Sequence, residues 1–211
     1  MERRLREANV KGSGGAGSKQ HELHLVAQAR VGDKKAIRDL VDLHKDRLFS
    51  FIWRMIRHHH DAEEVCQEAF LKAFASLNSY SGEYRFSTWL FTIGYRVCLN
   101  RLRRRKAMTS ELDLAALPLE AKSNPAETLE SEEASHLKSR VWNAVDQLSA
   151  PQRATILLFY RQEMGCHEIA RVLELPIATV KSHLHRARLR LRELLETVQE
   201  KDLQLFRNRA G

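Results

Sequence analysis

The sequence is poor in cysteine, and this scarcity limits the sites that it can build. Its 211 residues contain three cysteines that lie far apart and form no C-x-x-C pair, Cys66, Cys98 and Cys166. Disulfide frameworks and zinc sites need thiols that are paired or closely spaced. We therefore expect reduced thiols packed in or near helix faces, with a redox-sensitive cysteine as the alternative. The histidine run at 58–60 lacks a carboxylate–histidine set at ligand spacing, which predicts a loop between helices and no metal site.

Long apolar runs are absent as well. No stretch approaches the roughly 18 apolar residues that span a bilayer. The first 20 residues are charged at the front and rich in glycine and serine behind, without the apolar centre of a secretory signal. We therefore expect no membrane span and a cytoplasmic protein.

Signatures of catalysis are also missing. The sequence has no P-loop, no carboxylate cluster and no Ser or Cys nucleophile with a spaced His partner. This predicts a protein that is not an enzyme and that needs no cofactor. A DNA-processing enzyme such as a nuclease is the alternative that the sequence supports least.

Positive charge is what the sequence has in excess. Lys and Arg number 35 against 27 Asp and Glu, which gives a formal net charge of +8. Acidic residues are missing altogether from two basic stretches, 84–110 and 175–192. This pattern favours an anionic partner, either nucleic acid or an acidic protein face.

The hydrophobic pattern predicts an all-α fold of two small helical domains joined by a flexible acidic linker. Apolar residues recur at helical spacing on both sides of a segment that is acidic and contains Pro118 and Pro125. That segment has neither a helical period nor enough apolar residues for a core. The predicted divisions are a disordered tail at 1–20, a helical domain at 21–107, the linker at 108–133, a second helical domain at 134–197 and a C-terminal tail at 198–211.

Residues 165–192 predict a helix-turn-helix. Apolar residues at helical spacing give a short scaffold helix before Leu175-Pro176, a pair that ends it because proline disfavours a helical residue before it. A second apolar stripe runs from Val180 to Leu191. The opposite face carries side chains that suit the major groove of DNA, namely Thr179, Lys181, Ser182, His185, Arg186 and Arg188. A basic helix that is merely solvated is the alternative.

An acidic helix face is predicted in the first domain. The capping pattern Asp61-Ala62-Glu63-Glu64 indicates that a helix begins there. Its polar side is mostly acidic and includes Glu64, Gln67 and Glu68. Because carboxylates repel phosphates, this face suits a protein better than DNA. Taken alone, an ordinary solvated face is the alternative.

Residues 79–85 predict a turn-rich loop that leads into a basic helix. The loop carries Tyr80, Tyr84 and Arg85. Aromatic rings beside cations can stack on unpaired bases and hold them, at about 1–3 kcal/mol per base, which is comparable to the cost of unstacking. We therefore expect this region to hold a single strand, whereas a place in the core is the alternative for the aromatic residues of the following helix.

Two long segments resemble bacterial RNA polymerase sigma factors of the extracytoplasmic-function (ECF) group. Residues 148–195 look like the family's region 4 helix-turn-helix and carry Pro151-Gln152-Arg153, Glu168-Ile169-Ala170 and Thr179-Val180-Lys181-Ser182. Residues 61–106 look like its region 2 and carry the acidic helix, then Phe86-Ser87-Thr88-Trp89-Leu90 and a basic helix. The second set of motifs is far more specific than the first.

The resemblance implies a dissociable initiation subunit that directs core RNA polymerase to promoter DNA and helps to open it. Core polymerase would be bound by the acidic helix through Glu64, Gln67, Glu68, Phe70 and Phe74. The opening element, as an unpaired non-template strand, would be held by Tyr80, Tyr84, Arg85, Trp89, Arg96, Asn100, Arg101, Arg103 and Arg104. The upstream duplex would be read by Thr179, Lys181, Ser182, His183, His185, Arg186 and Arg188. An anti-sigma factor is implied as a further partner.

Four positions depart from the residues that are usual in the family. Arg96 stands where Asn is usual, Asn100 where Asp is frequent, Ala178 where Gly is usual and His183 where Arg is usual. Arg pairs with guanine or holds a phosphate, whereas Asn suits adenine, so the promoter sequence is not implied. The competing interpretation is a stand-alone helix-turn-helix regulator, which leaves 61–106 without a purpose. The linker is either a strand in the polymerase channel or a plain spacer.

Overall fold

The structure, a computed structural model, describes residues 15–111 and 132–209. Within these ranges the chain forms helices and turns and no strand, as predicted. The first group of elements is α1 (Gly15–Arg30), α2 (Lys34–Ile56), α3 (His59–Ala75), the 3-10 helix η2 (Leu77–Ser79) and α4 (Phe86–Glu111). The second group is α5 (Glu132–Asp146), α6 (Ala150–Tyr160), α7 (Cys166–Leu173) and α8 (Ile177–Arg209). Most of the predicted linker lies outside the described residues.

Helices α1 to α4 form the first domain, and local capping sets the limits of α2. Asp33 accepts hydrogen bonds from the backbone N–H groups of Lys35 and Ala36 at 2.7 and 3.3 Å, so it caps the helix. The helix ends where Arg57 adopts the left-handed conformation and its N–H reaches the Trp53 carbonyl at 2.8 Å. The largest fully buried side chains of this domain are Leu40, Leu48, Phe51, Ile52, Phe86, Leu90 and Phe91.

The start of α3 differs from the prediction. The helix begins at His59, ahead of the capping pattern at Asp61, so the prediction of a loop at 58–60 is wrong for His59 and His60 and holds for His58 alone. The reason is that His58 is itself the cap, since its Nδ1 accepts a hydrogen bond from the Asp61 N–H at 3.2 Å. Likewise, α1 begins at Gly15, within the segment that the composition predicts as a tail.

Helices α5 to α8 form the second domain and contain the helix-turn-helix. α6 starts at a capping box, in which Gln152 Oε1 accepts from the Ser149 N–H at 3.3 Å. α7 ends where Glu174 turns left-handed, with φ of 56°. Pro176 precedes α8 and its carbonyl accepts from the Val180 N–H at 3.1 Å. The apolar stripe of α8 is buried, as predicted, at Val180, Leu184 and Ala187.

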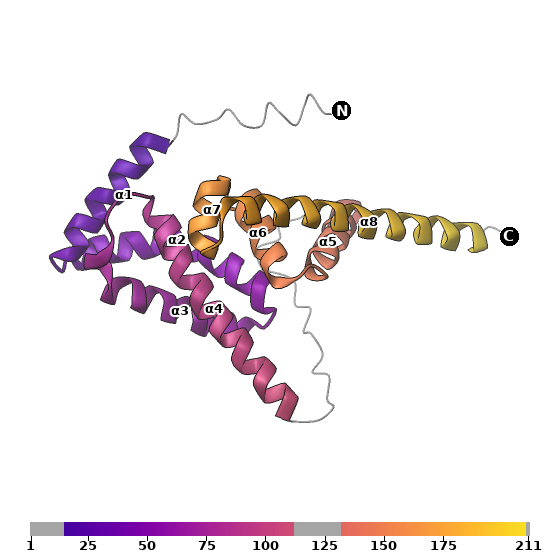
Figure 1. Ribbon diagram of the computed structural model, residues 1–211, viewed down its shortest axis with the longest axis horizontal. Coiled ribbons are helices and arrows are strands. Elements are labelled where there is room, and N and C mark those ends of the chain that lie inside the picture. The colour runs from indigo at the N-terminus through magenta and orange to yellow at the C-terminus, as the bar shows by residue number, and fades with distance from the viewer. Residues whose placement is uncertain (1–14, 112–131, 210–211) are drawn as a thin grey trace.

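The two domains pack against each other. α7 lies against α4 and α6 against α2 (Figure 1), so segments far apart in the sequence share one continuous apolar core. On α2, Arg47 donates from Nε to Gln162 Oε1 at 2.9 Å and from Nη2 to the Gln162 carbonyl at 3.1 Å. The last part of α8 extends away from this body (Figure 1). The linked domains therefore form a closed arrangement.

Candidate functional site

The exposed side of α3 is an acidic stripe with one large apolar side chain. Glu64, Gln67 and Glu68 are exposed as predicted, and Leu71 continues their stripe at the next helical turn. Leu71 is 72% exposed, more than Leu23, Leu43, Leu137 and Leu189, which are 36–58% exposed. Glu68 pairs with Lys72 at 2.7 Å. We call Glu64, Gln67, Glu68 and Leu71 the α3 face.

The two phenylalanines expected beside this face lie behind it. Phe70 is buried in the core and Phe74 is partly buried against it. Their rings stack with centroids 6.2 Å apart. Their place is therefore to support α3 from behind, and Leu71 rather than Phe70 presents apolar surface.

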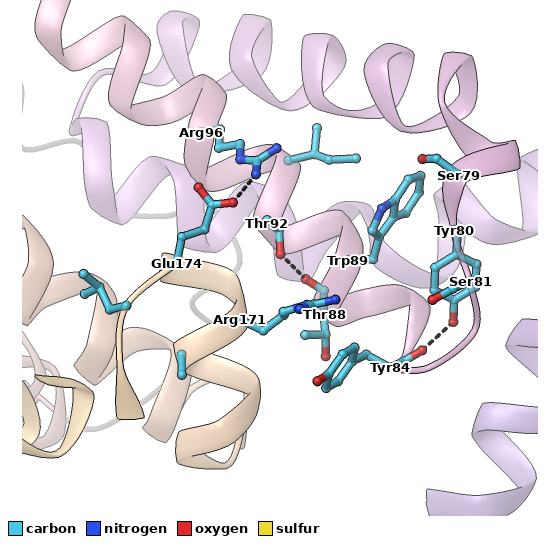
Figure 2. A pocket seen from close by; sticks show the side chains of 13 residues that line it. Ser79, Tyr80, Ser81, Tyr84, Thr88, Trp89, Thr92, Arg96, Arg171 and Glu174 are labelled. Atoms are coloured by element: carbon cyan, nitrogen blue, oxygen red, sulfur yellow. Dashed lines mark hydrogen bonds and ion pairs between the residues drawn. The ribbon is translucent and has the colours of Figure 1, made fainter. Parts of the chain in front are cut away.

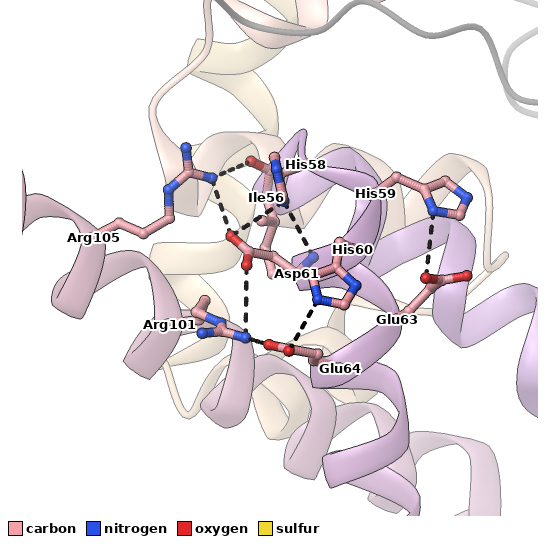
Figure 3. A network of polar contacts seen from close by, with 9 residues as sticks. All are labelled: Ile56, His58, His59, His60, Asp61, Glu63, Glu64, Arg101 and Arg105. Atoms are coloured by element: carbon pink, nitrogen blue, oxygen red, sulfur yellow. Dashed lines mark hydrogen bonds and ion pairs between the residues drawn. The ribbon is translucent and has the colours of Figure 1, made fainter. Parts of the chain in front are cut away.

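A polar network joins the start of α3 to the basic part of α4 (Figure 3). Arg101 forms ion pairs with Glu64 and, at 3.6 Å, with Asp61. Arg105 reaches Asp61 at 3.5 Å, and His60 lies 3.3 Å from Glu64. Arg101 therefore fixes the acidic end of the α3 face, although the resemblance assigns it to DNA.

Side chains of α1 contact the backbone of the loop before α4. Arg30 donates to the Leu77 carbonyl at 3.2 and 3.3 Å and also to the Tyr80 carbonyl. Gly82 has φ of +75°, and a Cβ there would lie 3.1 Å from a methyl group of Leu23 on α1, so glycine is needed for both reasons. These contacts fix the path of the backbone through the turn.

The side chain of Tyr80 is buried beneath this loop and does not face solvent. Its side chain is 4% exposed and packs between Phe86 and Trp89, with ring centroids 5.7 and 5.4 Å away. Its hydroxyl donates to the Tyr84 carbonyl at 2.6 Å, and burial raises the pKa of Tyr80 to about 12. Of the two tyrosines assigned to the unpaired strand, Tyr84 is the more exposed, and its side chain is half-buried.

Exposed cations follow one another along α4 and the loop before it. The residues assigned to the opening element that are exposed are Arg85, Arg96, Asn100, Arg103 and Arg104. Trp89 is half-buried between them. We call these six residues with Tyr84 the α4 surface. A cavity of about 560 Å³ opens beside it, between Tyr84, Trp89 and Arg96 on one side and Arg171 and Glu174 on the other (Figure 2).

The exposed side of α8 carries the side chains that the helix-turn-helix pattern predicts. Lys181, His185 and Arg186 are exposed. Arg188 is exposed too, but its Nε donates to the Tyr160 hydroxyl at 2.9 Å. Thr179, Ser182 and His183 are half-buried. We call Lys181, His185 and Arg186 the α8 surface, because these three side chains are exposed on one side of the helix.

The thiols are placed as expected from the sequence. Cys66 and Cys98 are buried, and burial raises the pKa of Cys66 to about 11 and that of Cys98 to about 12. Such thiols are not ionised at neutral pH and are poor nucleophiles. In 15–111 and 132–209 no three His, Cys, Asp or Glu side chains gather as a metal site. No helix in the described part of the chain is long and apolar enough to cross a membrane.

Three features of the site were missed by sequence reasoning. Leu71 could have been found, because it falls three, four and seven residues after Glu68, Gln67 and Glu64. Arg30 has no such signal, since its partners are carbonyls 47 and 50 residues away in the sequence. The contacts of Glu174 with α4 have no signal in the sequence either, because hydrophobic periodicity does not show which surface of one domain packs against the other.

Both domains match known protein families. The chain matches the family model of sigma-70 region 2 over residues 40–108 and that of sigma-70 region 4 over residues 138–191. It is similar to the ECF RNA polymerase sigma factor SigW of Bacillus subtilis, with 31% identity over 81% of this chain and 94% of the relative. It is also 31% identical to the ECF RNA polymerase sigma-E factor of Escherichia coli, over 78% of this chain and 88% of the relative.

A solved structure shares the fold. The sigma factor RpoE of Bartonella quintana, crystallised with the anti-sigma factor NepR, superposes with a TM-score of 0.64 at 26% identity, over 77% of this chain and 98% of that chain. Both domains seen here are thus those of sigma regions 2 and 4, and the resemblance inferred from the motifs is confirmed. The chain belongs to the ECF sigma factors of bacterial RNA polymerase.

Proposed function

We propose that the chain is a dissociable, non-enzymatic subunit that acts in the cytoplasm, binds core RNA polymerase and directs it to promoter DNA. The observation that carries the proposal is the separation of charge over the fold. An exposed acidic face lies on α3, while exposed cations lie on α4 and α8. One molecule thus offers one surface suited to a protein and two suited to DNA.

The α3 face is the surface for core polymerase. Its carboxylates disfavour phosphates, and Leu71 supplies the apolar contact that a stable protein interface needs at its centre. The ion pairs of Glu64 with Arg101 and of Glu68 with Lys72 fix the direction of both carboxylates before binding. An interface that is ordered in advance loses less side-chain entropy when it forms.

The α8 surface is suited to the duplex upstream of the start site. The buried stripe of α8 fixes the orientation of the helix, which leaves Lys181, His185 and Arg186 pointing outward. An exposed arginine on a recognition helix can bind guanine through two hydrogen bonds. Phosphate contacts by the other cations would set the register.

The α4 surface is suited to the unpaired non-template strand. Tyr84 and Trp89 offer ring faces to bases, and Arg85, Arg96 and Arg103 offer charge to phosphates. Stacked bases held in this way offset the free energy of melting. Core polymerase would hold both DNA-binding domains over one promoter, so neither needs much affinity alone.

An anti-sigma factor is the further partner that we infer. The Bartonella quintana relative was crystallised with such a protein, and it shares both domains with this chain. A binding protein that covers the α3 face or the α4 surface would compete with polymerase or with DNA.

The experiment that tests the proposed function is a mobility shift on a library of genomic fragments. The purified chain, core polymerase, and the two together are each incubated with the library at physiological salt. We expect selective retention of a small set of fragments with the mixture only. Selective retention by the chain alone would instead indicate a regulator that acts without polymerase.

The bracing of the loop by Arg30 gives a separate prediction. Arg30→Met removes the hydrogen bonds to the Leu77 and Tyr80 carbonyls, and hydrogen bonds to charged groups contribute about 1.5–3 kcal/mol each. We expect open-complex formation, measured by permanganate reactivity of unpaired thymines, to fall about tenfold, while binding to core polymerase is unchanged. The control is Arg38→Met, an exposed arginine whose Nε donates to the Lys34 carbonyl of its own helix. Equal effects of the two variants would contradict the role of Arg30.

A further inference from the structure

The second domain of this chain covers part of the α4 surface. Arg96 forms an ion pair with Glu174, the residue that ends α7 (Figure 2). Arg171 on α7 places its guanidinium 4.7 Å from the centre of the Tyr84 ring. Two members of the surface suited to the unpaired strand are therefore already bound by side chains from the other domain.

Further contacts extend this interface. Thr88 Oγ1 on α4 donates to Glu168 Oε1 on α7 at 3.2 Å. Arg171 also lies 3.7 Å from Glu83 in the loop before α4. α7 thus contacts the loop, the first turns of α4 and the side chain of Arg96, and it closes one wall of the cavity of about 560 Å³.

The contacts of α7 are of the kind that a nucleic-acid strand would make. Glu174 offers Arg96 a carboxylate where DNA would offer a phosphate. Arg171 occupies the face of Tyr84 on which a base would stack. Because one group cannot bind both partners in this way, α7 and an unpaired strand exclude each other from the α4 surface.

Buried contacts between the domains stabilise the closed arrangement, because the exposed ion pairs contribute little alone. Arg57, which caps the end of α2, pairs with Asp146 on α5, and both side chains are largely buried. The guanidinium of Arg54 lies 3.6 Å from the ring centre of Trp142. These contacts and the shared apolar core join the domains without involving Arg96 or Tyr84.

The closed arrangement affects the two DNA-binding surfaces unequally. Lys181, His185 and Arg186 on α8 stay exposed, so contact with a duplex is still open to the closed form. Arg96 and Tyr84 are engaged by α7. A closed chain can therefore touch duplex DNA, but Arg96 and Tyr84 are not available to an unpaired strand.

We propose that α7 is an intramolecular competitor of the unpaired promoter strand, with Arg171 and Glu174 as the side chains that take the place of base and phosphate. The proposal rests on the proposed function of the α4 surface. The interface opens when core polymerase holds the two domains apart, so strand capture is confined to the assembled enzyme. The free chain is then a poor single-strand binder.

The test removes the two competing side chains while keeping the net charge. The full-length variant Arg171→Gln with Glu174→Gln is titrated into fluorescein-labelled, mixed-sequence single-stranded oligonucleotides, and anisotropy is measured. The substitutions release Arg96 and Tyr84, which raises the apparent affinity for the single strand. We expect a gain of about tenfold, which corresponds to about 1.4 kcal/mol. Affinity for a duplex of the same length should not change.

The matched control is Arg192→Gln with Glu196→Gln, an exposed ion pair of 2.8 Å within α8 that removes the same charges without bridging the domains. It should bind single strands as the unchanged chain does. A double variant at 171 and 174 that gains nothing over this control would overturn the proposal. Binding of the unchanged chain and of each variant to core polymerase is measured alongside. If the unchanged chain does not bind core polymerase, the proposed function is refuted, but the competition between α7 and a single strand is not.

A second measurement does not depend on those substitutions. Dyes are attached at Leu43→Cys on α2 and Leu189→Cys on α8, both exposed positions, in a chain with Cys166→Ser. Energy transfer should be high in the free chain and should fall when core polymerase is added. Unchanged transfer in a complex that binds polymerase would show that the domains stay closed and would refute the opening step.

Discussion

Replacing Leu71 by aspartate is expected to weaken binding to core polymerase by at least about 30-fold, since apolar anchors at an interface centre contribute about 2 kcal/mol or more. Leu71 is 72% exposed on α3, so the substitution removes no contact within the core. A charge in its place must be desolvated when the interface forms, and it adds to the repulsion from Glu64 and Glu68. The measurement is the dissociation constant of the chain for core polymerase.

The control for Leu71→Asp is the same substitution at Leu43, which is 46% exposed on α2 and lies outside the α3 face. It should bind polymerase as the unchanged chain does. Glu68→Arg with Gln67→Ala should abolish co-purification with polymerase, because it reverses charge at the same surface. Both sets of variants should keep the helical circular dichroism signal. Retained binding by Leu71→Asp would show that α3 does not face polymerase.

Replacing Arg186 by alanine is expected to reduce recognition of the upstream promoter element by about 1–3 kcal/mol, or roughly 5- to 150-fold, if the residue reads a base. Arg186 is exposed on α8, one turn beyond Ser182 and beside the buried Ala187 that sets the helix orientation. The loss should be large on the preferred promoter and small on promoters altered at the contacted base pair. The measurement is binding of polymerase with the chain to a set of single-base promoter variants.

Arg190→Ala on the same helix serves as the control for Arg186→Ala. Arg190 is exposed, lies farther along α8 and pairs with Glu193 at 3.0 Å. It should change binding to all promoters slightly and equally, as a solvated charge does. Equal loss on every promoter by Arg186→Ala would instead identify that residue as a phosphate contact.

The helices of both domains could be predicted from the sequence because local rules govern them. Leu175-Pro176 separates the scaffold helix from the recognition helix as predicted, and the apolar stripe from Val180 is buried. The sequence predicts that α3 starts at Asp61, but it starts at His59, because the side chain of His58, a residue type that rarely caps helices, accepts a hydrogen bond from the Asp61 N–H. The error came from capping chemistry and not from the apolar pattern.

The candidate sites were predictable where helical spacing alone decides exposure. It separates the exposed Glu64, Gln67 and Glu68 from the core and also points to Leu71. Helical spacing does not predict side-chain exposure in a loop. Tyr80 is buried there because its ring packs against Phe86 and Trp89. Nor can helical spacing report a contact such as that of Arg96 with Glu174, which lies 78 residues farther along the chain.

The most direct measurement is photocrosslinking from three positions of the chain in a complex with core polymerase and an open promoter. The photoreactive amino acid p-benzoylphenylalanine is placed, one position at a time, at Leu71, Asn100 and Arg186. We expect position 71 to crosslink to polymerase, position 100 to the unpaired non-template strand and position 186 to the duplex farther upstream. Crosslinking of position 71 to DNA, or of positions 100 and 186 to the same few base pairs, would contradict the account.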